Sequence, residues 1–185
     1  DIRRVDHLGC DIIDAVSGWR DPQHVSEYLG RIPHLQPRLD GEEALVAAVR
    51  AFAGHTPVRS ILDLGCGDGR LTWRALEACP SVDRLVLADR SEPMLERARE
   101  GFAGFTGAEV CSHDLEDSIV GLGSFDLVIS GFAIHHLDHA RKRSLFAEVA
   151  EVLSDSPAAM FANFDVVSSP TEIEHAEFLA AIGRE

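Results

Sequence analysis

Residues 61–71 read Ile61-Leu62-Asp63-Leu64-Gly65-Cys66-Gly67-Asp68-Gly69-Arg70-Leu71. Together with Ser60, the first four residues form a short, mostly apolar run of the kind that predicts a buried parallel strand. Three glycines in five residues follow, and they let the chain turn sharply and bring bare backbone close to a ligand. A helical pattern then begins at Arg70. The stretch therefore predicts a strand, a tight turn suited to a ligand, and a helix.

The spacing of these glycines is G-x-G-x-G. Arg70 stands where the dinucleotide fingerprint G-x-G-x-x-G has its third glycine, which weakens a nicotinamide or flavin interpretation. Asp63, at the carboxyl end of the strand, would repel a pyrophosphate but would attract an α-ammonium group. The loop thus favours a zwitterionic ligand, and a turn that holds no ligand is the alternative.

A second acidic position follows at the correct distance. Residues 84–88 predict the next strand, and Asp89 comes at its end, 20 residues after Gly69. A carboxylate at this place can accept hydrogen bonds from both hydroxyls of a ribose. NAD-binding proteins use the same device, so Asp89 alone does not choose the cofactor. Ser91 is predicted to cap the following helix, and Met94 to face either the adenosine or the core.

Together the two motifs resemble those of class I S-adenosylmethionine-dependent methyltransferases of the small-molecule type. The resemblance implies that the glycine loop lies against the amino-acid part of S-adenosyl-L-methionine. It also implies that Asp114 accepts a hydrogen bond from the adenine amino group and that the backbone amide of Leu115 reaches a ring nitrogen; a plain surface turn is the alternative there. The residues predicted to bind the cofactor are Asp63, Gly65, Cys66, Gly67, Asp89, Arg90, Met94, Asp114, Leu115 and Ser130.

The residues after the fourth predicted strand, 125–130, bear on the reaction. They contain neither the Asn/Asp-Pro-Pro-aromatic box of DNA and protein methyltransferases that act on nitrogen nor the Pro-Cys pair of cytosine-C5 enzymes, and no second carboxylate suggests a metal. Residues 134–137, Ile-His-His-Leu, resemble a segment of small-molecule methyltransferases related to the ubiquinone and menaquinone enzymes. His135 or His136 is therefore a candidate general base, with an ordinary pKa of about 6.5. The alternative is a histidine that starts a helix and bonds to the backbone.

The composition limits the function classes further. The 185 residues suffice for one core, and 17 basic against 31 acidic residues give a net charge of −14, which argues against general nucleic-acid binding. The four cysteines lack C-x-x-C spacing, so no zinc site or disulfide framework is predicted. No apolar run reaches the roughly 20 residues of a membrane span, and no signal peptide is recognised. A cytoplasmic protein is the expectation.

The pattern along the chain predicts an α/β fold, a Rossmann-like, doubly wound, mostly parallel sheet in three layers. Residues 1–40, with Trp19 and Tyr28, are interpreted as an N-terminal helical lid or cap, although a cover for one sheet face is equally compatible. Residues 41–185 form the predicted cofactor-binding core, C-terminally truncated in that it lacks the antiparallel C-terminal hairpin of the full family fold. An open edge there would favour a homodimer. Further predicted elements are strands at 108–112 and 158–164 and helices at 5–16, 22–29, 41–52, 70–79, 92–102, 140–153 and 171–182. In the helix at 140–153, Phe146 is predicted to face the core, and Arg141 and Lys142 are predicted to face solvent.

The predicted activity is methyl transfer from S-adenosylmethionine to a small-molecule or carrier-bound acceptor. A sulfonium methyl group is already activated, so positioning for in-line displacement and exclusion of water supply most of the catalysis. Two other functions stay open. One is a catalytically inactive S-adenosylmethionine-binding module, and the other, less favoured, is an NAD-binding oxidoreductase.

Overall fold

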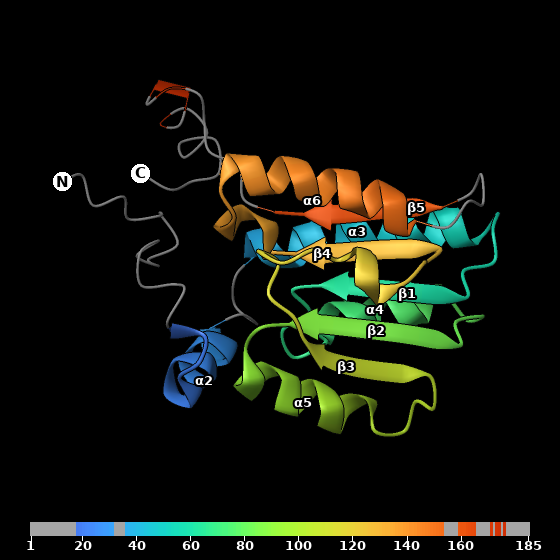
Figure 1. Ribbon diagram of the computed structural model, residues 1–185, viewed down its shortest axis with the longest axis horizontal. Helices are drawn as coiled ribbons and strands as arrows, with labels where there is room; N and C mark the ends of the chain where they lie inside the picture. Colours follow the sequence, from blue (N-terminus) through green and yellow to red (C-terminus); the bar gives the residue numbers. More distant parts are fainter. Residues whose placement is uncertain are drawn as a thin grey trace.

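The computed structural model describes residues 18–31, 36–153 and 159–165, together with residues 171, 173, 174 and 176. The predicted helix at 5–16 and most of the predicted helix at 171–182 lie outside the described residues. Figure 1 shows a central sheet with helices packed on it and the helix α2 (Pro22–Arg31) at one end.

The described residues form one sheet of five strands, all parallel, in the order β3-β2-β1-β4-β5. Strand β1 is central, with β2 on one side and β4 on the other (Figure 1). This order places a topological switch point between β1 and β4, where open α/β sheets bind their ligands. The strands are β1 (Ser60–Leu64), β2 (Arg84–Asp89), β3 (Ala108–Ser112), β4 (Leu127–Gly131) and β5 (Met160–Phe164).

Side chains alternate between the two faces of the central strands, and both faces are apolar. Ile61 and Leu85 pack in one core and Leu62 and Val86 in the other, and each is at most 2% exposed. Burial on both faces explains why these strands read as continuous apolar runs. The polar exception in β1 is Asp63, which is 1% exposed.

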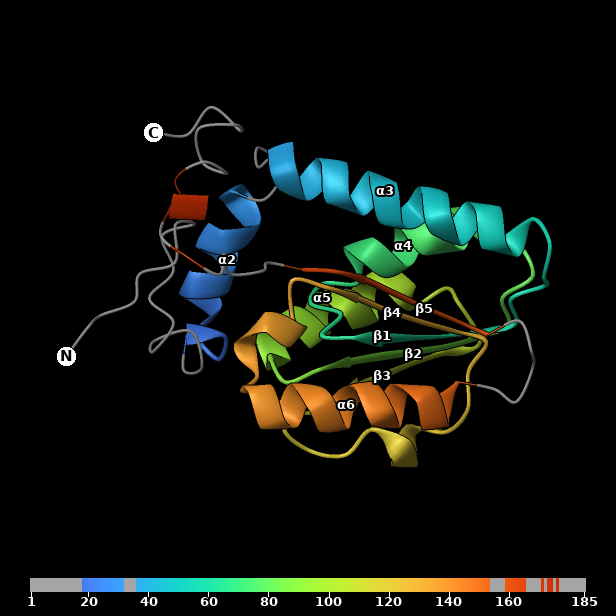
Figure 2. The same ribbon diagram turned by 90° about the horizontal axis from the view of Figure 1, so that it is seen from above.

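Helices cover both faces and make three layers (Figure 2). One face carries α3 (Gln36–Ala53), α4 (Arg70–Ala78) and α5 (Glu92–Phe102), and the other carries α6 (His139–Val152) and the short helix η2 (Val120–Leu122). Helix α2 lies beyond the carboxyl ends of the strands (Figure 2). The predicted fold class, a Rossmann-like three-layer α/β sheet, is confirmed.

Several predicted boundaries were wrong. Helix α3 begins at Gln36, not at 41, because Pro37 falls in its first turn, where a missing N–H costs nothing. The helix contains Gly41 at a position where no larger residue fits, because any Cβ there would lie 1.9 Å from the Phe164 ring. The helix crosses the line between residues 40 and 41, and the division into lid and core stays a prediction. Strand β4 begins at Leu127 and strand β5 at Met160, each two residues later than predicted.

Two expectations about α6 were also wrong. Phe146, predicted to face the core, is 45% exposed. Lys142, predicted to face solvent, is half-buried, and its Nζ donates to the carbonyl of His135 at 3.0 Å. Among the described residues no helix is long and apolar enough to cross a membrane, and no group of three or more potential metal ligands occurs.

Candidate functional site

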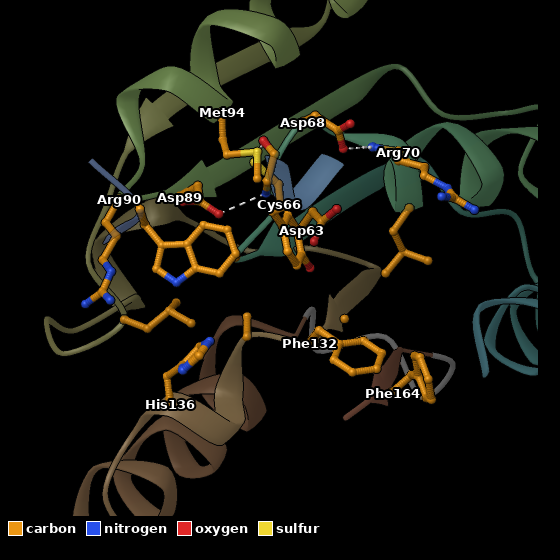
Figure 3. Close-up of a pocket in the computed structure, with 18 of the residues that line it drawn as sticks. Asp63, Cys66, Asp68, Arg70, Asp89, Arg90, Met94, Phe132, His136 and Phe164 are labelled. Carbon is orange, nitrogen blue, oxygen red and sulfur yellow. Dashed lines mark hydrogen bonds between the residues drawn. The ribbon is translucent and has the colours of Figure 1, made fainter. Parts of the chain in front are cut away.

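A cavity lies at the carboxyl ends of β1, β2 and β4, next to α2. Figure 3 shows Met94, Asp89, Cys66 and Asp63 along one side of it and His136 and Phe132 along the other. Nine of the ten residues predicted to bind the cofactor line this cavity, and they are Asp63, Gly65, Cys66, Gly67, Asp89, Arg90, Met94, Asp114 and Leu115.

The glycine loop forms one wall of the cavity through a left-handed backbone. The φ angles are 72° at Gly65, 56° at Gly67 and 81° at Gly69, values that favour glycine. The N–H of Gly65 donates to the carbonyl of Ala88 at 2.8 Å, which holds the loop against β2. A Cβ on Gly65 would lie 2.2 Å from the Cβ of Ala133, so the loop after β4 can approach only because no side chain is present.

Asp89 joins the glycine loop to the tip of β2. One carboxylate oxygen accepts the N–H of Gly67 and the other accepts the N–H of Ser91, each at 2.8 Å (the first bond is dashed in Figure 3). Burial raises the pKa of Asp89, while these backbone donors oppose the rise. Each oxygen keeps acceptor capacity, so the carboxylate can receive the two hydroxyls of a ribose. Ser91 stands at the N-cap position, but its side chain makes no capping bond and donates instead to the carbonyl of Trp19.

Asp63 is a buried acid with one unused oxygen. Its Oδ2 accepts a hydrogen bond from the Thr72 hydroxyl at 2.6 Å, and its Oδ1 is buried without a partner in the described part of the chain. Burial raises the pKa of Asp63 to about 7. An ammonium group in the cavity would satisfy Oδ1 and favour the ionised form, whereas a phosphate would not.

The loop after β3 forms the opposite end of the cavity. The N–H of His113 donates to the carbonyl of Asp89 at 2.9 Å, and its buried Nε2 has no partner among the described residues. Asp114 lies 3.7 Å from the guanidinium of Arg90. Both His113 and Asp114 line the cavity, so this end offers polar atoms for an aromatic base.

Arg141, predicted to face solvent from α6, instead holds this loop in place. Its guanidinium donates to the carbonyl of Leu115 at 2.6 Å and to that of Asp117 at 2.7 Å, and it is paired with Glu148 at 2.6 Å. The Glu148 carboxylate also accepts the N–H of Ile119 at 3.0 Å. Arg141 and Glu148 are opposite charges seven residues apart on one predicted helix, and this spacing was the sequence signal that could have predicted their ion pair.

Ser130 is the one predicted cofactor residue that does not line the cavity. It is fully buried, and its hydroxyl donates to the carbonyl of Leu64 at 2.7 Å. Side chains alternate along a strand, and Ser130 faces the interior between β4 and β1, so a contact of Ser130 with the cofactor stays a prediction that the cavity lining does not support. Its role is to join these two strands.

The two histidines that were predicted as candidate bases have different surroundings. His136 lines the cavity, and its ring lies 6.4 Å from that of Trp19. His135 does not line the cavity; its Nδ1 lies 2.5 Å from Oδ1 of Asp165, and its backbone N–H donates to Oδ2 of the same carboxylate. The His135 ring therefore contacts a carboxylate and not the backbone that the alternative named, and a catalytic role for His135 or His136 stays a prediction.

Cys66 lines the cavity without the character of a reactive thiol. It is 7% exposed, and burial, with the nearby Asp63 carboxylate, raises its pKa well above the ordinary value. A thiol that stays protonated is a poor nucleophile. The structure therefore favours a space-filling role for this small side chain.

Sequence reasoning missed the far wall of the cavity. Helix α2 contributes Tyr28, helix α3 contributes Arg38, and the ends of β4 and β5 contribute Phe132 and Phe164. Phe132 has a φ of 56°, an outlier for an aromatic residue, and its ring packs edge-on against Phe164 at 4.8 Å. The aromatic residue Tyr28 was noted in the sequence, but nothing local distinguished Arg38 or Phe132.

Comparisons with known proteins agree with this geometry. A family model described as a methyltransferase domain matches residues 61–156. An uncharacterised methyltransferase of Anoxybacillus flavithermus is 25% identical over 156 residues, covering 84% of this chain and 68% of its own. The malonyl-[acyl-carrier protein] O-methyltransferase of Chlorobium phaeovibrioides is 32% identical over 126 residues, covering 66% of this chain and 46% of its own.

Solved structures show the same fold. The complex of DhpI with SAM and HEP superposes with a TM-score of 0.63 at 20% identity, over 90% of this chain and 71% of DhpI. The family match confirms the predicted resemblance, and the five-stranded sheet carries its switch-point cavity where that resemblance requires it. The chain therefore belongs to the methyltransferase domain family, the S-adenosylmethionine-dependent transferases of class I.

Proposed function

We propose that this chain binds S-adenosylmethionine in the cavity at the carboxyl ends of β1, β2 and β4 and transfers its methyl group to a small-molecule or carrier-bound acceptor. The observation that carries the proposal is a pair of buried polar atoms without partners in the described residues, Oδ1 of Asp63 and Nε2 of His113. Both residues line the same cavity, one beside the glycine loop and the other beyond β3. Unpartnered buried polar atoms are costly, and a bound ligand would satisfy them.

Three acidic residues along the cavity support a cofactor that lies from the glycine loop to the loop after β3. Asp63 suits the ammonium group, Asp89 the ribose hydroxyls and Asp114 the amino group of adenine. Met94, which is 3% exposed, adds an apolar side chain to the cavity wall. A pyrophosphate against the glycine loop would meet the buried carboxyl group of Asp63, and the ionised form of that group would repel it. The buried acid at the glycine loop thus favours S-adenosylmethionine over NAD.

The chain's own residues contribute mainly by positioning the cofactor and limiting the access of water, and less by proton transfer. The cofactor supplies an activated methyl group when bound. The left-handed glycine loop and Asp89 are already joined by a hydrogen bond of 2.8 Å, so the ribose acceptor is in place before binding. The aromatic side chains Trp19, Phe132 and Phe164 line the cavity, and around a bound cofactor they would limit the access of water.

The acceptor is proposed at the level of class. The Chlorobium relative is named for a carrier-bound acceptor, and the cavity is also compatible with a free small molecule. A net charge of −14 makes a nucleic-acid acceptor unfavourable. The chain spans 46% of that relative's length, so its acceptor is not transferred to this chain.

Calorimetric titration tests the proposal. S-adenosylmethionine and S-adenosylhomocysteine are expected to bind with micromolar affinity, and NAD is expected not to bind. Binding of NAD alone would indicate the oxidoreductase alternative. Binding of neither by a folded sample would mean that the glycine loop serves only as structure, and binding without turnover across an acceptor panel would favour the inactive binding module.

A further inference from the structure

Trp19, which precedes α2, contacts both walls of the cavity. Its carbonyl accepts a hydrogen bond from the hydroxyl of Ser91, just after Asp89 in the chain. Its ring lies 6.4 Å from the ring of His136, measured between centroids. Asp89 and His136 are on opposite sides of the cavity (Figure 3). Trp19 therefore bridges the wall formed by the end of β2 and the wall formed by the loop after β4.

Helix α2 itself holds Trp19 in this place. The Trp19 ring packs edge-on against the ring of His24 at 5.2 Å and against that of Tyr28 at 4.7 Å. The N–H of Val25 donates to the carbonyl of Asp21 at 3.1 Å, and Val25 is 1% exposed, so the first turn of the helix is anchored in the interior. The position of Trp19 is thus set by packing within α2 as well as by its contacts with the cavity walls.

Ser91 contacts Trp19 and the cofactor site at the same time. It is 1% exposed, and its N–H donates to Oδ1 of Asp89 at 2.8 Å. A serine at the N-cap of a helix ordinarily uses its side-chain oxygen for a backbone N–H of the first turn. At the start of α5 the Ser91 side chain makes no such bond, and its hydroxyl donates to Trp19, 72 positions earlier in the chain. The hydroxyl can therefore be removed without loss of a helix cap and without loss of the N–H that orients Asp89.

The cavity is too small for the cofactor while Trp19 lies in this position. Its volume is about 110 Å³, whereas pockets that bury a drug-sized ligand have volumes of roughly 300 to 1,000 Å³. The glycine loop is tied to β2 by the bonds of Gly65 to Ala88 and of Gly67 to Asp89, so this wall cannot withdraw. The contacts of Trp19 with the walls are fewer, a hydroxyl–carbonyl bond on one side and an edge contact between rings on the other. Entry of the cofactor therefore requires Trp19 to move.

We propose that the hydrogen bond between the Ser91 hydroxyl and the Trp19 carbonyl is an autoinhibitory latch, which keeps the cavity closed in the free protein and opens before the cofactor enters. This inference rests on the proposed function and adds a regulation of the same site. In the bound protein Trp19 lies farther out and packs against the cofactor, so the latch stabilises the free state alone. The apparent affinity is therefore lowered in proportion to the small fraction of molecules in which the latch is open.

The test is surface plasmon resonance with the immobilised chain and S-adenosylhomocysteine in solution. Ser91→Ala is expected to bind about 2- to 12-fold more tightly than the parent chain, chiefly through a higher association rate constant, since the closed state loses one hydrogen bond. Trp19→Ala removes the ring that bridges the two walls, and its association rate constant should rise at least as much. This second variant decides the question even if Ser91→Ala fails to fold.

Each variant has a matched control. Ser124→Ala changes an exposed serine just before β4, and Trp73→Ala changes the second tryptophan of the chain, which is 45% exposed on α4 and does not line the cavity. Both controls should bind as the parent does. An unaltered or lower association rate constant in folded Ser91→Ala or Trp19→Ala would overturn the inference. If S-adenosylhomocysteine binds the parent and all variants at equal rates, only the latch is refuted; if it binds none of them, the proposed function fails as well.

Discussion

The backbone N–H of Gly67 donates to Oδ2 of Asp89 at 2.8 Å, so the glycine loop and the tip of β2 are joined across 22 residues of sequence. The two motifs that predict the cofactor site are thus one structural unit. The second oxygen of Asp89 is oriented by Ser91 in the same way. The carboxylate is held in a single orientation before any ligand binds, and this lowers the entropic cost of binding.

Asp89→Ala is expected to weaken binding of S-adenosylhomocysteine by about 2 to 3 kcal/mol, or about 30- to 150-fold, because a charged acceptor for two hydroxyls is lost. Calorimetry measures the affinity. The matched control is Asp83→Ala, since Asp83 is an exposed acid just before the same strand and its pair with Arg59, at 3.8 Å, contributes little. An unaltered affinity in Asp89→Ala would refute the assigned position of the ribose.

Gly65→Ala is expected to destabilise the fold by about 2 to 5 kcal/mol and to abolish cofactor binding. The φ of 72° strains any side chain, and the new Cβ would lie 2.2 Å from that of Ala133. Gly104→Ala is the control, because a Cβ there meets no atom within 4 Å. Urea denaturation of both variants gives the comparison. Equal stabilities would show that the close approach of the loop after β4 to the glycine loop does not constrain the site.

The half of the cavity that carries the predicted cofactor motifs could be predicted because its signals are local. Asp63 and the three glycines stand within seven residues, and Asp89 follows at a distance fixed by one helix and one strand. The parallel sheet could be predicted for the same reason, since each strand is a short apolar run between turn residues. The regular spacing of a βαβ unit carries this information along the chain.

The far wall of the cavity could not be predicted, because its residues meet only in three dimensions. Arg38 contacts Phe132 across 94 positions, and His135 contacts Asp165 across 30. Neither contact leaves a periodic or motif signal in one sequence. Ser130 differs for another reason: the end of its strand lies at the cavity as predicted, but the alternation of side chains turns the Ser130 hydroxyl toward Leu64.

Ser130→Ala tests whether the Ser130 hydroxyl serves the fold or the cofactor. Loss of the hydroxyl leaves the buried carbonyl of Leu64 without this donor, and we expect the free energy of unfolding to fall by about 1 to 2 kcal/mol. Because Ser130 does not line the cavity, affinity for S-adenosylhomocysteine should change less than about twofold. Denaturation and calorimetry on the same sample separate the two effects. A large loss of affinity with unchanged stability would restore Ser130 as a cofactor residue.

The raised pKa of Asp63 predicts a pH dependence of stability in the free protein. Burial holds this pKa at about 7 in the folded state, against an ordinary value of 3.8. Between these two values the folded chain binds more protons than the unfolded chain, so the free energy of unfolding falls as pH rises from about 4 to 7. The contribution is at most about 4 kcal/mol, and it should be absent in Asp63→Asn. Denaturation at pH 5 and pH 7.5 measures it. Asp89, whose pKa is also raised, contributes in the same direction in both proteins, so the difference between them isolates Asp63.

Cofactor binding should reverse this effect at Asp63. An ammonium group beside the unpartnered Oδ1 favours the ionised carboxylate, so binding near pH 6 is expected to release a proton, and affinity should rise with pH up to about 7. Calorimetry in two buffers of different ionisation enthalpy counts the protons released. Asp63→Asn cannot ionise, and its remaining carbonyl oxygen already has a donor in the Thr72 hydroxyl, so it should bind more weakly and release fewer protons. Equal proton release by the two proteins would place the ammonium group elsewhere in the cavity.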